Sequence, residues 1–291
     1  MKKTITVIML LFFCQLSYSE ATSKDIEKSI QKLQIKETRQ EAIKEIEKIG
    51  KPAIIHLRRL AKNKTKDSDS RISSIVLIGK LKDIDSRIDI EEILAKDTDK
   101  YCREASAIAL GNIGDKGAIQ HLKNALKDRS GNVRMRAVWA LAKLGDKSGK
   151  RLALDTIKGK DVTAQLLAVD ALEVIGDKDV IPELKKNLKS KNVWTRIHSQ
   201  LAIKKIEILG LTEDQKLNYL KETLKDKQLE INRWASMELA KIGTEEAIKI
   251  LKETAKDEKI AGSYSAKKIL LQLVEQGKIA NPSQNASEKS Q

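Results

Sequence analysis

Apolar residues recur at spacings of three and four over most of the chain, which is the period of an amphipathic α-helix. The segment VRMRAVWALAKLGD (133–146) shows this most clearly, with Ala137, Ala140, Leu141 and Leu144 on one helical face. Arginine and lysine side chains lie off this stripe. The pattern therefore predicts helices that each bury one face.

The same pattern occurs 31 residues earlier, in the segment CREASAIALGNIGD (102–115). Gly114 there corresponds to Gly145, and the apolar positions before the two glycines also agree. A fixed period of this length indicates stacked repeats in which neighbouring units share one core. Two helices of about ten to fifteen residues with short turns fill one period, so each repeat is predicted to be a helical hairpin.

A turn residue that favours a left-handed helix end recurs with the same period. The turn positions are 50, 82, 114, 145 and 176, with glycine at each except Lys82. In the sixth repeat Glu207 stands where a glycine is due and Gly210 follows, which predicts a lengthened turn. These positions predict where each hairpin ends and the next begins.

An aspartate and an arginine six residues apart recur in the repeats, as Asp97 with Arg103 and as Asp128 with Arg134. This spacing resembles the HEAT repeat, in which an Asp in the turn and an Arg starting the second helix recur. The resemblance implies a ladder of charge-assisted hydrogen bonds between neighbouring repeats. The predicted ladder residues are Asp97, Arg103, Asp128, Arg134 and Arg196. Gln165 takes the arginine position in the fifth repeat, where we expect the ladder to lapse.

The second helix and the Gly-Asp turn look most like the short HEAT-like repeats of phycobilisome lyases. The resemblance covers about residues 40–260, at the level of the repeat alone, and supports no catalytic residue. It implies an all-α fold, a right-handed α-solenoid (α-α superhelix) of about seven stacked helical hairpins. We expect this solenoid to form one domain over residues 23–280, because a solenoid has no internal boundary.

Both ends of the chain differ from the repeats. Residues 1–19 have Lys2 and Lys3 directly after Met1, continue with an apolar run over 5–13 and end at Ser19, which predicts a secretory signal peptide. The apolar run is too short for a membrane span. Phe13 precedes Cys14 where a lipoprotein signal requires a small residue, so we do not expect a lipoprotein. We expect an exported protein, periplasmic or secreted, with a disordered tail at 281–291.

No motif for catalysis, a metal or a cofactor stands out. The three histidines, His56, His121 and His198, lie in no metal-binding spacing. Deoxyhypusine hydroxylases are stacked helical repeats whose paired His-Glu motifs hold two irons, and no Glu follows any of these histidines. The sequence therefore predicts that the chain is not an enzyme, with no catalytic, cofactor-binding or metal-binding residues and no cofactor.

Large apolar side chains recur on the predicted second helices at positions outside the buried stripe. The resemblance places second helices on the concave side, so these residues form a candidate partner-binding row. Exposed apolar patches rimmed by charge mark protein-binding surfaces. The alternative is that neighbouring helices cover them. The row comprises Met135, Trp139, Leu166, Ile197, Leu201, Trp234 and Met237.

The formal net charge of +15 favours acidic partners or anionic surfaces. The signal peptide argues against nucleic acid. The sequence thus predicts a non-catalytic scaffold or adaptor that binds a protein or peptide partner on the concave face, in the cell envelope. Two alternatives stay open: a HEAT-like enzyme of lyase or hydroxylase type, and a basic module that binds anionic lipid or cell-wall polymer.

Overall fold

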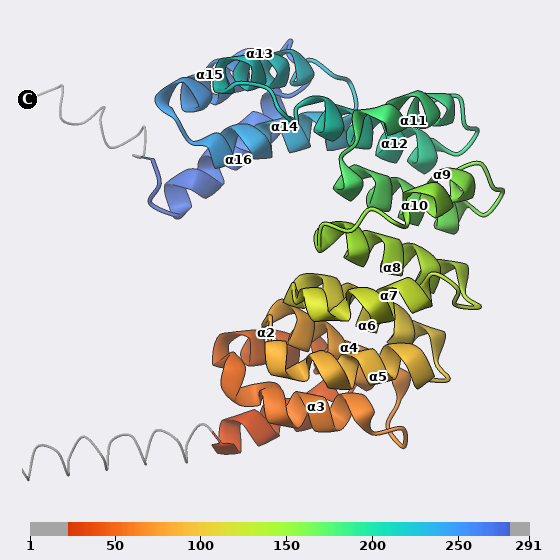
Figure 1. The fold of residues 1–291 in the computed structure, drawn as a ribbon. Coiled ribbons are helices and arrows are strands. Elements are labelled where there is room, and N and C mark those ends of the chain that lie inside the picture. Colours follow the sequence, from red (N-terminus) through yellow and green to blue (C-terminus); the bar gives the residue numbers. More distant parts are fainter. Residues whose placement is uncertain (1–22, 280–291) are drawn as a thin grey trace, which may run out of the picture. The chain divides into compact units, whose positions relative to one another are not determined.

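The computed structural model describes residues 23–279, which form α-helices and short 3-10 helices and contain no strand (Figure 1). This confirms the predicted all-α solenoid class. The chain divides into two compact units, with the boundary between Ile175 and Gly176. Each unit consists of helical hairpins, in which a first helix is followed by an antiparallel second helix. No helix within 23–279 is both long and apolar enough to span a membrane.

The first unit begins with a helix over residues 23–33, which pairs with α2 (Arg39–Ile49). Four further hairpins follow, and three of their first helices begin with a 3-10 turn. The first helices are α3 (Ile54–Lys62, after η1, Lys51–Ala53), α5 (Arg87–Lys96, after η2, Ile84–Ser86), α7 (Ile119–Ala125, after η3, Lys116–Ala118) and α9 (Lys150–Thr156). The second helices are α4 (Ser68–Lys80), α6 (Lys100–Ile113), α8 (Gly131–Lys143) and α10 (Val162–Ile175).

The second unit contains three hairpins. Their first helices are α11 (Ile181–Asn187, after η4, Lys178–Val180), α13 (Glu213–Thr223) and α15 (Glu245–Lys256). Their second helices are α12 (Val193–Glu207), α14 (Leu229–Ile242) and α16 (Ser263–Glu275). Helix α12 extends to Glu207, and the turn ends at Gly210 with a φ of 78°. The lengthened turn predicted here is confirmed.

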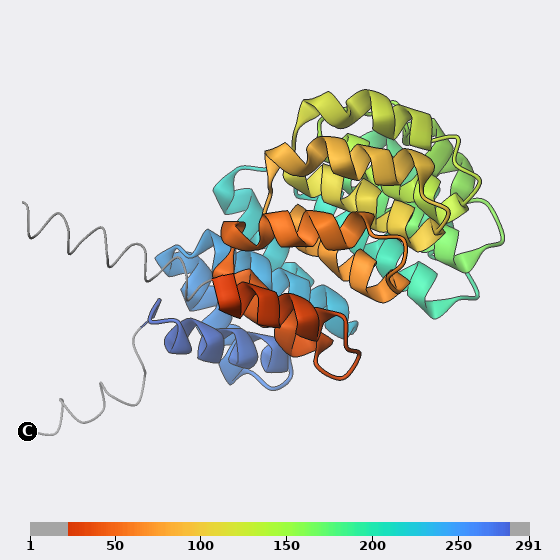
Figure 2. The same cartoon turned by 90° about the horizontal axis from the view of Figure 1, so that it is seen from below.

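In the first unit, consecutive second helices pack directly against one another, and their first helices form a neighbouring layer. Figure 2, seen from below, shows the helices of this unit following one another in chain order. The close approach of the second helices depends on small residues. A Cβ at Gly79 would lie 2.7 Å from the Ala109 Cα, and one at Gly111 would lie 2.9 Å from the Ala140 Cα. These contacts place the second helices in one continuous face.

The predicted turn residues all have positive φ angles. Lys82 has a φ of 52° and is the one non-glycine residue with a positive φ among residues 23–279. The glycines with positive φ are Gly50, Gly114, Gly145, Gly176, Gly210, Gly243 and Gly277. The period seen in the sequence is therefore a period of left-handed helix ends, because each hairpin requires the same reversal.

Two predicted segments, the signal peptide at 1–19 and the disordered tail at 281–291, lie outside the described residues. The extent of the repeat domain, 23–280, also stays a prediction. What the described residues establish is the succession of hairpins that positions the second-helix side chains.

Candidate functional site

The arginine ladder of the first unit connects consecutive hairpins. Arg103 Nε lies 2.8 Å from Asp128 Oδ2, and Arg103 Nη2 lies 3.0 Å from Asp128 Oδ1. Arg71 makes the preceding rung with Asp97. The carboxylates of the two ladder aspartates therefore bind the arginine of the hairpin before them, and not the arginine six residues later. The predicted ladder between neighbouring repeats is present in this unit, and each rung joins an arginine to the aspartate of the following hairpin.

The residue in the arginine position also stabilises its own turn. It donates a side-chain hydrogen bond to the carbonyl six residues earlier, as Arg103 does to Asp97 at 2.9 Å and Arg134 to Asp128 at 2.8 Å. Arg196 donates in the same way to Ser190 at 2.6 Å, and Gln165 to Gly159 at 2.6 Å. Gln165 therefore keeps the bond within its own turn, but its uncharged amide cannot make the arginine's ion pair with the next hairpin.

Two predicted rungs lack their carboxylate partner. Gly159 occupies the aspartate position that would follow Arg134, and Arg134 makes no ion pair with any residue in 23–279. Arg196 likewise makes none within the described chain, and the following turn aspartate, Asp226, accepts instead from Gln200 at 2.9 Å. The prediction of charged rungs at Arg134 and Arg196 is therefore wrong.

The ladder carboxylates are held ionised by their partners. Burial alone would raise the pKa of Asp128, but hydrogen bonds from Arg103 and from the Ser130 N–H lower that pKa below its usual value. The pKa of Asp97 is lowered in the same way, against its burial, by Arg71 and the Asp99 N–H. Each aspartate is thus bound on both sides, so these two carboxylates are structural and are not available to a ligand.

The structure separates the predicted apolar row of the first unit into buried and accessible residues. Met135 is 1% exposed, so it lies in the core and cannot contact a partner. Trp139 and Leu166 are partly exposed. The Trp139 ring packs beside Gly111. The Lys143 Nζ lies over this ring, 5.4 Å from its centroid, in a cation–π contact. Trp139 and Leu166 therefore lie on the accessible surface formed by the second helices, which we call the second-helix face, and Met135 does not.

In the second unit, Ile197 and Trp234 are 7% and 8% exposed, so their assignment to the row is also wrong. Leu201 is partly exposed and packs against the core of this unit. Met237, by contrast, is 41% exposed. The row followed in the sequence therefore mixes buried, partly exposed and exposed side chains, and it does not form one accessible surface.

Besides Met237 and Leu271, the exposed large apolar side chains of the second helices lie in the first helical turn, and none of these first-turn residues belongs to the predicted row. Side chains in a first turn point toward the helix N-terminus and beyond the preceding turn, so little packs over them. The sequence signal was an apolar residue one or two positions after a capping residue. These residues are Tyr101 and Val162 in the first unit, and Val193, Trp194, Leu229 and Tyr264 in the second.

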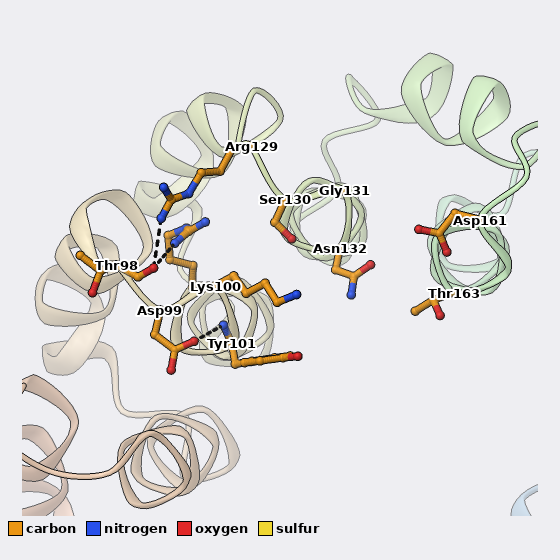
Figure 3. Close-up of a pocket in the computed structure, with 11 residues that line it drawn as sticks. Thr98, Asp99, Lys100, Tyr101, Arg129, Ser130, Gly131, Asn132, Asp161 and Thr163 are labelled. Atoms are coloured by element: carbon orange, nitrogen blue, oxygen red, sulfur yellow. Dashed lines mark hydrogen bonds between the residues drawn. The ribbon is translucent and has the colours of Figure 1, made fainter.

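A cavity of about 780 Å³ lies at the first turns of α6, α8 and α10. Figure 3 shows Lys100 and Tyr101 on one side of it and Asp161 and Thr163 on the other. Asp99 accepts a hydrogen bond from the Tyr101 N–H at 2.8 Å, and Arg129 donates to the Thr98 carbonyl at 3.1 Å. The remaining lining residues are Arg103, Ser130, Gly131 and Asn132.

Two buried polar atoms lie further along the second helices α6 and α8. Glu104 Oε1 and Arg136 Nε make no hydrogen bond in the described part of the chain. Burial raises the pKa of Glu104, although Asn132 and Arg136 oppose the shift. Buried polar atoms without a partner are uncommon in folded proteins. This face therefore retains hydrogen-bonding capacity beside the cavity.

The second unit contains a different cavity, of about 350 Å³, between α14 and α16. It combines apolar and cationic side chains. Its lining residues are Leu229, Arg233, Met237, Tyr264, Ser265, Lys268, Ile269 and Gln272.

Nothing in the described residues assembles a metal centre: 23–279 contains no group of three or more His, Cys, Asp and Glu residues suited to a metal ion. His121 lies alone beside a carboxylate, with Nδ1 3.4 Å from Glu91 Oε2. Cys102 is buried, and burial raises its pKa to about 11, which keeps the thiol protonated and unreactive.

Residues 89–159 match the family of HEAT repeats. Among solved structures, phycocyanin lyase from Nostoc sp. PCC7120, a complex of CpcE and CpcF, is similar with a TM-score of 0.50 and 20% identity, covering 75% of this chain and 87% of that one. Human deoxyhypusine hydroxylase in complex with glycerol follows (TM-score 0.41, 16% identity, 87% and 96% covered). An archaeal HEAT-like repeats protein from Thermococcus onnurineus NA1 is also similar (TM-score 0.35, 15% identity, 85% and 95% covered). No curated protein matched the chain.

Residues 89–159 thus contain HEAT repeats, and the chain has the fold of HEAT-like repeat proteins, as the period of its sequence predicted. The expectation that it is not an enzyme needs correction. The fold is shared with a phycocyanin lyase, so a chain of this fold can serve catalysis as well as scaffolding. The absence of recognisable catalytic and metal-binding motifs in the sequence does not exclude catalysis.

Proposed function

We propose that the protein is a scaffold of the cell envelope that binds a protein or peptide partner on its second-helix face. The observation that carries this proposal is the cavity of about 780 Å³ at the first turns of α6, α8 and α10. Three successive repeats contribute side chains to this cavity. Stacked repeats commonly form extended binding surfaces in this way.

The side chains around this cavity suit a polypeptide. Tyr101 is 54% exposed and carries the Lys100 Nζ 4.9 Å from its ring centroid. Tyrosine is among the residues that contribute most to protein interfaces, because it presents apolar area and a hydroxyl together. Asn132 and Thr163 offer hydrogen-bond donors and acceptors along the same edge. An aromatic anchor within a polar rim is typical of a protein-binding surface.

The net charge indicates the character of the partner. A chain with a formal charge of +15 attracts acidic surfaces, and such attraction raises association rates at low salt. Export through the predicted signal peptide would bring the chain to envelope proteins. We therefore expect an acidic partner protein whose association slows as the ionic strength rises.

Affinity capture with a matched pair of variants tests this function. Tagged protein, produced with its first 19 residues removed, is incubated with envelope extract as wild type and as Tyr101→Ala/Thr163→Ala. The control is Ile84→Ala/Ile88→Ala, which removes two exposed side chains (62% and 67%) from the first-helix side of the same unit. Captured proteins are then purified and titrated directly.

The Tyr101→Ala/Thr163→Ala variant should bind the captured partner at least about tenfold more weakly, and the control should bind as wild type does. Equal loss in both variants, or no loss in either, would contradict binding at the second-helix face. Circular dichroism of each variant reports whether the helices are intact.

A further inference from the structure

The last two second helices of the second unit carry matching stripes of side chains. On each helix the stripe repeats every fourth residue, so its members lie on one face. An exposed apolar residue comes first, and a cation follows one turn later. The stripes are Leu229, Arg233 and Met237 on α14, and Tyr264, Lys268 and Gln272 on α16.

The spacing between the stripes is fixed by a buried residue. Asn232 is 2% exposed, and its Oδ1 accepts a hydrogen bond from Ser265 Oγ at 2.6 Å. Its Nδ2 donates to the Ala261 carbonyl at 3.3 Å. Because Asn232 lies on α14 and its two partners lie in or next to α16, these bonds join the helices. The groove between them is therefore formed before any ligand binds.

The two cations in the groove have no counter-ion. Neither Arg233 nor Lys268 forms an ion pair with another residue of 23–279, and no acidic residue lines the cavity. Nearby lysines behave differently: Lys267 lies 3.1 Å from Glu258, and Lys241 pairs with Glu238. The groove thus presents two uncompensated positive charges between apolar side chains, which is complementary to carboxylates beside an apolar side chain.

The C-terminal segment of the chain is a poor occupant. The C-terminal sequence 280–291 (ANPSQNASEKSQ) has no large apolar side chain to enter the cavity. A flat lipid surface is also a poor match, because the apolar residues line a concave cavity of about 350 Å³, which is large enough to take a side chain. A segment of another protein meets both requirements.

We propose that the groove between α14 and α16 binds an acidic amphipathic helix of a partner protein. An apolar side chain of that helix enters the cavity beside Leu229 and Met237, and its carboxylates lie against Arg233 and Lys268. This inference rests on the proposed function and adds the class of partner segment and its place on the second unit. Amphipathic helices bind grooves through apolar residues at helical spacing.

A charge-reversal experiment tests the proposal. The probe is a fluorescent peptide of about 15 residues with leucines at i, i+4 and i+7, flanked by glutamates. A second probe has lysines in place of the glutamates. Both are titrated by fluorescence anisotropy into the protein lacking residues 1–19, as wild type and as Arg233→Glu/Lys268→Glu. The matched control, Lys252→Glu/Lys256→Glu, changes the net charge equally on α15, away from the groove.

We expect the groove variant to bind the glutamate peptide at least about tenfold more weakly and to gain affinity for the lysine peptide, because charge complementarity sets partner preference. The α15 control should bind as wild type does. Absence of glutamate-peptide binding to wild type, or equal loss in the two variants, would overturn the proposal. Binding that is sensitive to Arg233 and Lys268 only with phosphatidylglycerol vesicles would also overturn it, in favour of a membrane surface.

The Tyr101→Ala/Thr163→Ala variant separates this proposal from the function on which it rests. It should bind the peptide normally, because its substitutions lie in the first unit. Partner capture that needs Tyr101 but is indifferent to Arg233 and Lys268 would leave the scaffold function intact and refute the groove.

Discussion

Arg103 and Asp128 form a two-pronged ion pair between consecutive hairpins, with nitrogen–oxygen distances of 2.8 and 3.0 Å. Their side chains are 4% and 12% exposed. Asp128 also accepts from the Ser130 N–H at 2.7 Å and thereby shapes the turn that starts α8. One carboxylate thus links the previous repeat to the turn of its own repeat.

Removing one member of this pair should be strongly destabilising. Arg103→Ala leaves the Asp128 carboxylate buried without its partner, which we expect to lower the free energy of unfolding by about 3 kcal/mol. Arg151→Ala is the control. The Arg151 side chain is 87% exposed, so its ion pair with Asp155 should contribute less than about 1 kcal/mol. Urea unfolding followed by circular dichroism measures both. Similar losses in the two variants would show that the ladder adds little.

The free energy of unfolding should fall at acidic pH as the turn aspartate Asp146 becomes protonated. The ion pair with Lys123 and the hydrogen bond from Ser148 lower the pKa of Asp146 to about 2. Because this folded pKa lies below the unfolded value of about 4, the contribution is complete above about pH 4 and disappears as the pH falls toward 2. Urea midpoints of wild type and Asp146→Asn should therefore converge over that interval. Midpoints that keep a constant separation would contradict this role for Asp146.

Lys82 offers a stabilising substitution. Its φ of 52° lies in the left-handed region that side chains with a Cβ disfavour, and the other hairpins have glycine at the same turn. Lys82→Gly should raise the free energy of unfolding by about 0.5–1 kcal/mol, since relief of strain exceeds the added freedom of the unfolded chain. The reciprocal variant, Gly145→Ala, should lose about 1 kcal/mol, because no atom lies within 4 Å to clash and only the backbone is strained. If the stability of Lys82→Gly is unchanged or lower, Lys82 does not strain the backbone of its turn.

Gly79 tests the packing of the second helices. Gly79→Ala would place a Cβ 2.7 Å from the Ala109 Cα on α6, so the helices must separate, which should cost about 1–3 kcal/mol. The control is Gly131→Ala, whose Cβ would meet only the Arg134 guanidinium, at 3.6 Å. Thermal unfolding of both variants measures the difference. A tolerated Gly79→Ala would mean that the helices do not need this close contact.

The repeat could be predicted well because its signals are local. A left-handed helix end depends on one residue, so even Lys82 was placed correctly without a glycine. The spacing of Asp97 and Arg103 revealed the ladder but not its register, since both residues belong to one hairpin and the bond crosses to another. Only the packing of neighbouring hairpins shows that Asp97 faces Arg71.

The candidate site was predicted less well, for a related reason. Met135 and Trp234 follow a regular row in the sequence, but both are buried, whereas Met237 of the same row is 41% exposed. Tyr101 and Tyr264, which lie in the first turns of their helices, are 54% and 66% exposed. Periodicity identifies one face of a helix and says nothing of how far along the helix its neighbour reaches. Accessibility at this level depends on tertiary packing.

Site-specific photo-crosslinking measures most directly whether the second-helix face binds the partner. A photoreactive phenylalanine analogue is placed at Tyr101, at Tyr264 and, as control, at Ile88, which is 67% exposed on α5. The protein is then irradiated with envelope extract or with the purified partner. We predict crosslinks to the same partner from positions 101 and 264 and none from position 88. Crosslinks from position 88 alone, or equally from all three positions, would contradict a partner-binding second-helix face.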